Sequence, residues 1–406
     1  MRGVLVCGFL AIMMLVGGCG GGGNTPKTGT SSNNTIAGMA ANVQPITVDP
    51  GPANFVNTLF TSVTVCVPGT ANCQTIDHVQ VDTGSSGLRI MASALPGGVV
   101  LPPQLDQGAN PIAECMQFAD GYSWGPVKLA DVKIAGEQTS AKIPVQVIGD
   151  PVYSGIPNSC SSSGPAENTV ATFGANGLLG VGVLKQDCGS MCATVAANGF
   201  YYTCPTTVAC QETAQDLDQQ VSNPVALFAN DNNGVIVELP PIPSSGAASV
   251  SGALVFGIGT QANNDPGAAK IFQATPDSGT FTTNYNNRFI NFSLFDTGSS
   301  ALYFSDGNTP LCNPNDVAAD FYCPASTQTL SATIVGTHGV GAVLGFSVAN
   351  ATDLFNNNPS SWAFNNVAAP MADSFIWGLP AFYGRNVFVA IEGQNTKAGL
   401  GPYFAF

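Results

Sequence analysis

From Ile46 onward, the chain consists of short apolar runs that turn-forming residues separate. In runs such as residues 60–67 and 127–134, apolar and polar positions alternate, as in a strand with one face on a core. Gly, Pro and Asn stand between the runs, while good helix formers such as Glu, Lys and Leu are scarce. The pattern therefore predicts an all-β protein with few short helices.

Two segments depart from the strand pattern. Residues 212–228 are the best helical candidate, because Leu217 and Val221 lie at i and i+4. The cysteine-containing stretch from about residue 183 to Cys210 is expected to be a surface excursion. Further strands are expected at residues 77–81, 143–148, 235–239, 253–258, 333–335, 343–348, 375–378, 387–391 and 399–406.

The sequence Asp-Thr-Gly-Ser-Ser occurs twice, at residues 82–86 and 296–300. A strand-forming run precedes each copy, and a second apolar run follows it. Further along each half, two apolar residues precede a glycine, at residues 178–180 and 376–378. These matches predict a duplicated structural unit in which each copy carries an acid. Two acids that a twofold relation brings face to face can activate a water molecule.

The composition limits the function classes. At 406 residues the chain is long enough for two domains or one large bilobal domain. Only 9% of the residues are charged, and the formal net charge is −14. Nucleic-acid binding is therefore not expected, because it requires a basic face.

The first residues predict export. Arg2 precedes an apolar stretch, residues 4–16, that is too short to span a bilayer comfortably. Residues 15–19 resemble a bacterial lipobox, in which the cysteine becomes the lipidated N-terminus. We therefore assign residues 1–18 to a lipoprotein signal peptide and residues 19–45 to a lipidated Cys19 and a flexible tether. Ordinary secretory cleavage near this point is the alternative.

Ten of the 12 cysteines remain when Cys7 and Cys19 are set aside. In an exported chain, an even number of cysteines predicts disulfides that cross-link loops. A zinc site is disfavoured, because there is no Cys-x-x-Cys and both histidines are far from the cysteine clusters. Proximity in sequence suggests the pairs Cys66 with Cys73, Cys188 with Cys192, Cys204 with Cys210 and Cys312 with Cys323, and leaves Cys115 with Cys160.

These features together resemble the pepsin-like aspartic proteases over nearly all of the mature chain. Residues 375–382 resemble the segment that crosses behind the second catalytic turn of that family. Residues 387–402 resemble its closing hairpin, and residues 255–259 resemble the strand that ends its first lobe. The detailed sequence is diverged, as in a bacterial lipoprotein branch catalogued as a domain of unknown function.

The resemblance implies a bilobal pepsin-like fold of two β lobes related by a pseudo-twofold, at residues 46–262 and 263–406. It also implies that Asp82 and Asp296 form a catalytic pair on the floor of the cleft between the lobes. Two carboxyl groups a hydrogen bond apart cannot both ionise cheaply, so they share one proton. One then takes a proton from water, while the other hydrogen-bonds the scissile carbonyl.

The residues that follow each acid are of types that can support it. Glycine permits a tight turn in which a backbone N–H approaches the carboxylate. The threonines are expected to hydrogen-bond across the twofold and to fix the spacing of the lobes. The serines can donate to the outer carboxylate oxygens, which favours ionisation and, by resemblance, an acidic optimum. These supporting residues are Thr83, Gly84, Ser85, Thr297, Gly298 and Ser299.

In the family, a hairpin flap that typically carries a Tyr followed by Gly closes over the substrate. The corresponding stretch here is residues 117–125, and Phe118 falls where the Tyr is expected. Tyr122 or Trp124 can substitute, since either offers a ring and a polar hydrogen; alternatively, all three side chains simply pack the hairpin. This departure affects flap closure and specificity but not the acid pair.

The sequence thus predicts an aspartic-type endopeptidase of the bacterial cell envelope that hydrolyses polypeptides. We expect a monomer without metal or organic cofactor, held by its N-terminal lipid at the outer membrane or the periplasmic face. The rival hypothesis is a catalytically weak or inactive envelope lipoprotein of the same fold, with a binding or structural role. The altered flap favours the rival, whereas both intact acids with their serine partners favour the enzyme.

Overall fold

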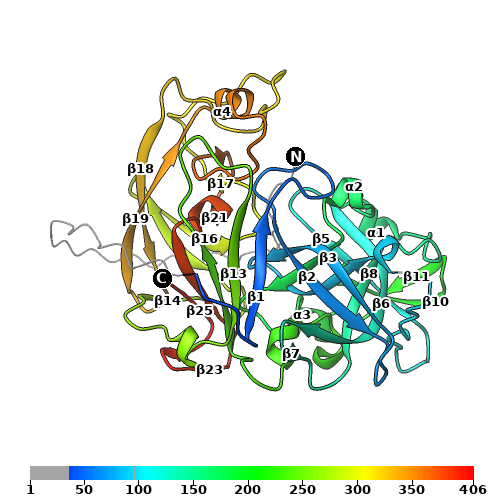
Figure 1. Ribbon diagram of the computed structural model, residues 1–406. Coiled ribbons are helices and arrows are strands. Elements are labelled where there is room, and N and C mark those ends of the chain that lie inside the picture. The colour runs from blue at the N-terminus through cyan, green and yellow to red at the C-terminus, as the bar shows by residue number, and fades with distance from the viewer. Residues whose placement is uncertain (1–35, 96) are drawn as a thin grey trace, which may run out of the picture.

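The chain folds into two β lobes that lie side by side (Figure 1). The computed structural model describes residues 36–95 and 97–406. Strands from the first half of the chain, blue to green, form one lobe, and strands from the second half, yellow to red, form most of the other. The all-β, bilobal fold expected from the sequence is confirmed. The proposed signal peptide and Cys19 lie outside the described residues.

The strands are short, and the helices are few and shorter still. The strands of the first part are β1 (Val43–Val48), β2 (Leu59–Cys66), β3 (Cys73–Asp82), β4 (Ser86–Met91), β5 (Ile112–Gln117), β6 (Tyr122–Ile134), β7 (Glu137–Gln138), β8 (Ile143–Ile148), β9 (Gly177–Val181), β10 (Tyr201–Thr206), β11 (Ala209–Glu212), β12 (Gly234–Leu239) and β13 (Val250–Phe256). Those that follow are β14 (Ile271–Gln273), β15 (Phe281–Tyr285), β16 (Arg288–Asp296), β17 (Leu302–Tyr303), β18 (Gln328–Val335), β19 (Gly341–Val348), β20 (Ala368–Ala369), β21 (Ser374–Gly378), β22 (Arg385–Ala390), β23 (Asn395–Thr396), β24 (Gly399–Leu400) and β25 (Tyr403–Ala405). The α-helices are α1 (Asn158–Ser161), α2 (Val170–Phe173), α3 (Ser190–Thr194) and α4 (Ala351–Asn357), and the 3-10 turns are Ala92–Ala94, Leu217–Gln219, Pro224–Leu227, Ala262–Asn264 and Leu379–Ala381.

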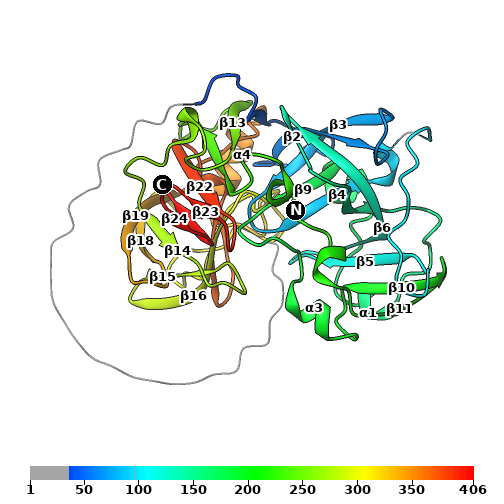
Figure 2. The same cartoon turned by 90° about the horizontal axis from the view of Figure 1, so that it is seen from below.

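The largest sheet joins the two halves of the chain. In the described part of the protein it has 16 strands, beside sheets of seven and two strands. Within it, β1 pairs with β13, β13 with β12, and β12 with β22 from the second half. Figure 2 shows green β13 and red β22 in this shared layer. Backbone hydrogen bonds, and not only side-chain contacts, therefore connect the lobes.

Each acid-bearing strand has a parallel neighbour, and the two pairings match. β3 pairs with β9 so that Asp82 lies opposite Gly180, and β16 pairs with β21 so that Asp296 lies opposite Gly378. A side chain on either glycine would overlap the backbone that leaves the acid turn, at Ser86 in the first lobe and at Ala301 in the second. The duplicated motif therefore corresponds to a duplicated strand arrangement.

An aromatic core lies beneath the second acid turn. Phe295, which precedes Asp296, stacks on Trp377 with ring centroids 6.1 Å apart. Trp377 is fully buried and its indole N–H donates to Thr283 Oγ1 at 3.1 Å. Because the polar hydrogen is satisfied, this ring can be buried without an unpaired donor. The acid turn therefore rests on a tightly packed base.

Residues 212–228 do not form the helix that the sequence predicted. Beyond β11 the segment contains only the 3-10 turns Leu217–Gln219 and Pro224–Leu227. Pro224 has no N–H to donate within a helix, and the N–H of Val221 donates to the Tyr201 hydroxyl at 2.8 Å. Val221 is buried whereas Leu217 is 45% exposed. The two residues therefore do not share a buried helical face.

The cysteine-containing stretch before it is only partly a surface excursion. β10 within it pairs with β5 and with β11, which extends the sheet of the first lobe. Tyr201 and Tyr202 of β10 are both 0% exposed. The expectation of a surface loop is therefore wrong for β10, because its side chains pack on both faces of the added strand.

Five disulfides form among the described residues. They join the four pairs that proximity in sequence suggested, Cys66 with Cys73, Cys188 with Cys192, Cys204 with Cys210 and Cys312 with Cys323, and the remaining pair, Cys115 with Cys160. Such a set is compatible with an exported protein. Among the described residues, no helix has the length and apolar character needed to cross a membrane.

One buried carboxylate lies within the sheet that joins the lobes. Glu238 of β12 is 3% exposed, and its Oε1 accepts from Asn386 Nδ2 on β22 at 3.1 Å. Its Oε2 accepts from the backbone N–H of Ala37 at 2.5 Å. Burial raises the pKa of Glu238 to about 6, although the bond from Ala37 acts in the opposite direction.

A raised carboxyl pKa makes folding more favourable in acid. The stabilising contribution of Glu238 is fully present below the unfolded pKa, 4.5, and is lost as the pH rises through about 6. The loss corresponds to up to about 2 kcal/mol. In Glu238→Gln, the difference in unfolding free energy between pH 4.5 and pH 7 should therefore shrink by up to that amount. Urea titrations at both pH values measure it, and an unchanged difference would contradict the assignment.

Candidate active site

The two acids stand at the ends of strands and are held by sharp turns. After Asp82 the chain turns and continues as β4, and after Asp296 it turns and continues as β17. The carbonyl of Ser85 accepts a hydrogen bond from Gly182 N at 2.8 Å. In the second lobe, the carbonyl of Ser299 accepts from Leu379 N at 2.8 Å. Each turn is therefore braced by the chain that follows its parallel neighbour strand.

The structure brings Asp82 and Asp296 face to face where the lobes meet. Their exposed fractions are 1% and 0%, and the two carboxyl groups are close enough for the charge of Asp82 to raise the pKa of Asp296. A Cβ atom on Gly84 would lie 2.6 Å from Cγ of Asp296, and one on Gly298 would lie 2.7 Å from Oδ1 of Asp82. Glycine is therefore required at both positions, because any side chain would occupy the space of the opposite carboxyl group.

Each carboxylate is held by donors from its own turn. Gly84 N donates to Asp82 Oδ1 at 2.7 Å, and Gly298 N donates to Asp296 Oδ1 at 2.8 Å. The hydroxyl of Ser85 donates to Asp82 Oδ2. In the second lobe, Ser299 Oγ donates to Asp296 Oδ2 at 2.5 Å. The inner and outer oxygens of both acids are therefore fixed in equivalent ways.

The two threonines connect the turns reciprocally. Thr83 N donates to Thr297 Oγ1 at 3.1 Å, and Thr297 N donates to Thr83 Oγ1 at 3.0 Å. Each hydroxyl then donates to a carbonyl across the interface, Thr83 to Phe295 at 2.9 Å and Thr297 to Val81 at 2.8 Å. All four hydrogen bonds are buried. They set the distance between the two acid-bearing turns.

The site favours retention of one proton. The pKa of Asp296 is well above its usual range, first because burial removes water and second because the charge of Asp82 faces it. The hydrogen bonds from Ser299 and Gly298 lower the pKa of Asp296, but by less than burial and the charge of Asp82 raise it. The pair can therefore present a carboxylate and a carboxylic acid together. Such a pair can accept a proton from one group and donate a hydrogen bond to another.

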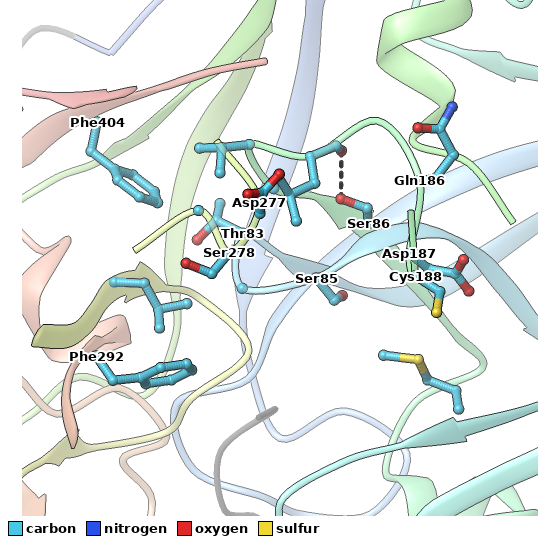
Figure 3. Close-up of a pocket in the computed structure, with 17 residues that line it drawn as sticks. Thr83, Ser85, Ser86, Gln186, Asp187, Cys188, Asp277, Ser278, Phe292 and Phe404 are labelled. Carbon is cyan, nitrogen blue, oxygen red and sulfur yellow. Dashed lines mark hydrogen bonds between the residues drawn. The ribbon is translucent and has the colours of Figure 1, made fainter. Parts of the chain in front are cut away.

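A pocket borders the first acid turn between the lobes (Figure 3). Thr83 and Ser85 lie at its centre, Phe292 and Phe404 line one side, and Asp187 lies on the other. Its volume is about 750 Å³, part of it open to solvent. Both lobes line the pocket: Phe292, Phe404, Asp277 and Ser278 come from the second lobe, and Met116 and Leu184 from the first. The pocket can receive a side chain that lies next to the acid pair.

Tyr122 and Trp124 lie on the side of the β5–β6 hairpin that faces away from this pocket. In the ladder, Trp124 pairs with Cys115, one residue from Met116, and it is Met116 that lines the pocket. Trp124 packs edge-on against Tyr202, and its indole N–H donates to the carbonyl of residue 153 at 2.9 Å. Alternation along a strand places neighbours on opposite faces. Both side chains therefore pack the hairpin and cannot cover the acids.

Phe118 lies at the tip of the hairpin. It is half-buried, and its ring packs edge-on against Phe173 of α2 at 5.8 Å between centroids. Across the cleft, Tyr303 of β17 has its hydroxyl 3.3 Å from Ser300 Oγ. Burial, together with the charges of Asp120 at the hairpin tip and of Asp296, raises the pKa of Tyr303. An aromatic ring with a polar hydrogen is therefore supplied near Asp296 by the second lobe.

A buried ion cluster that the sequence did not reveal lies beside the site. Arg89 of β4 contacts Glu114 and Asp187, and all three side chains are 0% exposed. A signal was present, because Arg89 is one of only 11 Lys and Arg residues and stands between Leu88 and Ile90 in an apolar run. A lone charge in such a run requires a buried partner. The identity of the partners could not be read from the sequence.

The described residues contain no group of three or more His, Cys, Asp or Glu side chains placed to hold a metal ion.

The requirement for glycine in the acid turns should be measurable as a loss of unfolding free energy when a glycine is replaced by alanine. Gly298→Ala should destabilise the fold by about 1–3 kcal/mol, because its Cβ overlaps the Asp82 carboxyl and the turn must shift. Gly307→Ala is the matched control in the same lobe, since nothing lies within 4 Å of its Cβ position. Urea unfolding of both variants measures the effect. Equal stability of the two variants would show that the turns are not in close contact.

The reciprocal threonine bonds give a second prediction. Thr83→Val keeps the shape but leaves Thr297 N and the Phe295 carbonyl without their partners. The expected loss of unfolding free energy is on the order of 2–4 kcal/mol, from two unsatisfied buried groups. Thr64→Val, which removes only an exposed bond to Thr75, should change it by less than about 0.5 kcal/mol. Similar values for the two variants would rule out a bracing role for Thr83.

The comparisons with known proteins give a family and a fold. No curated protein matches the sequence. Among solved structures, the crystal structure of aspartic proteinase from Irpex lacteus is similar, with a TM-score of 0.53 and 16% sequence identity over 90% of this chain and 96% of that chain. At this identity the likeness shows a common pepsin-like fold. The family model described as "Protein of unknown function (DUF3443)" matches residues 38–406, and the chain belongs to that family.

Proposed function

We propose that the protein is an aspartic endopeptidase that hydrolyses polypeptides with a water molecule activated by Asp82 and Asp296. The observation that carries the proposal is the buried pair itself: two carboxyl groups that face each other on equivalent, similarly braced turns, each next to the glycine of the opposite turn. The likeness to a solved aspartic proteinase supports it at the level of the fold.

The chemistry requires one carboxylate and one carboxylic acid. The ionised member of the pair takes a proton from water, while the protonated member hydrogen-bonds the scissile carbonyl and stabilises the developing oxyanion. The raised pKa of Asp296 favours a shared proton in acidic solution. A proton held by the pair is then transferred to the nitrogen of the leaving amine. Neither step calls for a metal or an organic cofactor, and we propose that none is used.

The pocket beside the Asp82 turn supports a polypeptide substrate. It is lined by Gly84 and Ser85 of the turn and by Phe292 and Leu184. A substrate that crosses the acids can therefore place a side chain there. We further propose that the protein acts as a monomer in the bacterial cell envelope, anchored through a lipid on Cys19.

The decisive test is cleavage of a denatured protein mixture by the form from about Ile36, from pH 3 to pH 7. We expect activity in acid that falls as the pH rises through the raised pKa of Asp296, because the shared proton is then lost. Asp82→Asn and Asp296→Asn should each lower the rate at least about 100-fold. Asp218→Asn, an exposed acid far along the chain, is the matched control. Mass spectrometry of new peptide termini gives rate and specificity together.

A second function is a binding role without efficient turnover. The placement of Tyr122 and Trp124 on the far face of the hairpin favours it, because they cannot close over a substrate. A folded wild-type protein that cleaves nothing, yet melts at a higher temperature with a statine-containing peptide, would support this role, since a ligand stabilises the state that it binds.

A further inference from the structure

A buried guanidinium group lies where the Asp82 turn, the β5–β6 hairpin and the pocket wall meet. Arg89 is on β4 and is 0% exposed. Its Nη1 donates to the carbonyl of Ser86, at the exit of the turn, at 2.9 Å. Its Nη2 donates to Glu114 Oε1 on β5 at 2.6 Å and to Asp187 Oδ2 in the pocket wall at 2.8 Å. One side chain therefore bridges three elements that surround the candidate site.

The partners of Arg89 are themselves held in place. The Tyr201 hydroxyl donates to Asp187 Oδ1 at 2.7 Å and accepts from Val221 N at 2.8 Å. The backbone carbonyl of Glu114 accepts from Gln146 Nε2 at 2.8 Å. Because the Asp187 carboxyl group and the backbone of Glu114 are held in place, the guanidinium defines a distance between the hairpin and the turn.

The stability of the fold does not by itself explain why this cluster is present. Burial opposes the charge on Arg89, but the charges of Glu114 and Asp187 outweigh it and raise the pKa of Arg89. Burial and the charge of Glu114 raise the pKa of Asp187. Among the described residues, Arg89 Nε and Glu114 Oε2 lack hydrogen-bond partners. A buried ion cluster with unsatisfied atoms contributes little net stability, so another reason for its presence is needed.

The duplicated unit shows that the turn itself does not require this charge. Arg89 follows Asp82 by seven residues, and Tyr303 follows Asp296 by seven residues. Both are buried, on the strands that leave the two turns. The second lobe thus builds an equivalent acid turn with a neutral side chain at this place. The difference lies in the first lobe, where the strand after the turn faces the hairpin.

The hairpin strand that Arg89 contacts continues to the site. Met116 shares the face of β5 with Glu114 and lines the pocket together with Thr83 and Gly84. Its sulfur lies 3.3 Å from Arg89 Nη2. A shift of β5 relative to β4 would therefore change the pocket directly and would move the hairpin tip at residues 118–121.

We propose that Arg89 is a positioning residue: through Glu114 and Asp187 it holds the β5–β6 hairpin and the pocket wall at a fixed distance from the Asp82 turn, and so determines how tightly the cleft holds a polypeptide. The inference rests on the proposed function. It assigns Arg89 no contact with the reacting atoms, so its loss should weaken substrate binding more than the chemical step.

The test uses the purified full chain and a charge-neutral cluster. Arg89→Met alone leaves two buried carboxyl groups without a cation and is expected to fold poorly. The triple variant R89M/E114Q/D187N removes all three charges and keeps similar volumes, so it should fold. Arg288→Met, which breaks the exposed pair with Asp373, is the control for loss of an arginine. Hydrogen exchange of the hairpin amides and peptide-cleavage kinetics are then compared.

In the triple variant, we expect KM to rise about tenfold while kcat changes by less than about threefold, which is the pattern of lost binding. Amides of residues 117–122 should exchange at least about tenfold faster, because the hairpin is released. A folded triple variant with wild-type KM and exchange would overturn the proposal, as would a fall in kcat without a change in KM. If the wild type cleaves nothing but the hairpin exchange still rises in the triple variant, the peptidase function fails while the positioning role of Arg89 stands.

Discussion

The close contact between two identical acid-bearing turns is the constraint on which the rest of the site depends. The reciprocal bonds of Thr83 and Thr297 draw the two backbones together. At that distance only glycine fits at the position that faces the opposite carboxyl group. The same approach buries both acids, and burial then raises the pKa of Asp296. The spacing of the turns, the glycine in each of them and the raised pKa of Asp296 thus all follow from one contact.

The contact also explains how the lobes can be firmly joined and still enclose a pocket. Strands of both halves pair in one sheet, so the lobes are connected through backbone hydrogen bonds as well as through the threonines. Beside the turns, each lobe then presents its own wall. Phe292, Phe404, Asp277 and Ser278 come from the second lobe, and Met116 and Leu184 come from the first. The duplicated turns are alike, whereas the residues around them are not.

The surroundings differ most at the strand that leaves each turn. In the first lobe Arg89 connects this strand to the hairpin, and in the second Tyr303 occupies the corresponding place. The hairpin belongs to the first lobe alone, and its aromatic residues Tyr122 and Trp124 pack away from the acids. The hairpin therefore does not present Tyr122 or Trp124 to the acids.

The sequence by itself determined the fold class and the duplicated acid turns, because alternation and an exact repeat are local properties of the chain, whereas it only suggested the disulfide pairs. It failed at residues 212–228, where the Tyr201 hydroxyl takes the N–H of Val221 and Pro224 cannot supply one. It could not choose among Phe118, Tyr122 and Trp124, since the face of a hairpin depends on register. The partners of Arg89 come from β5 and from the loop after β9, 25 and 98 residues away. Only the tertiary structure decided those contacts, because burial forces a charge to find partners but does not say where along the chain they lie.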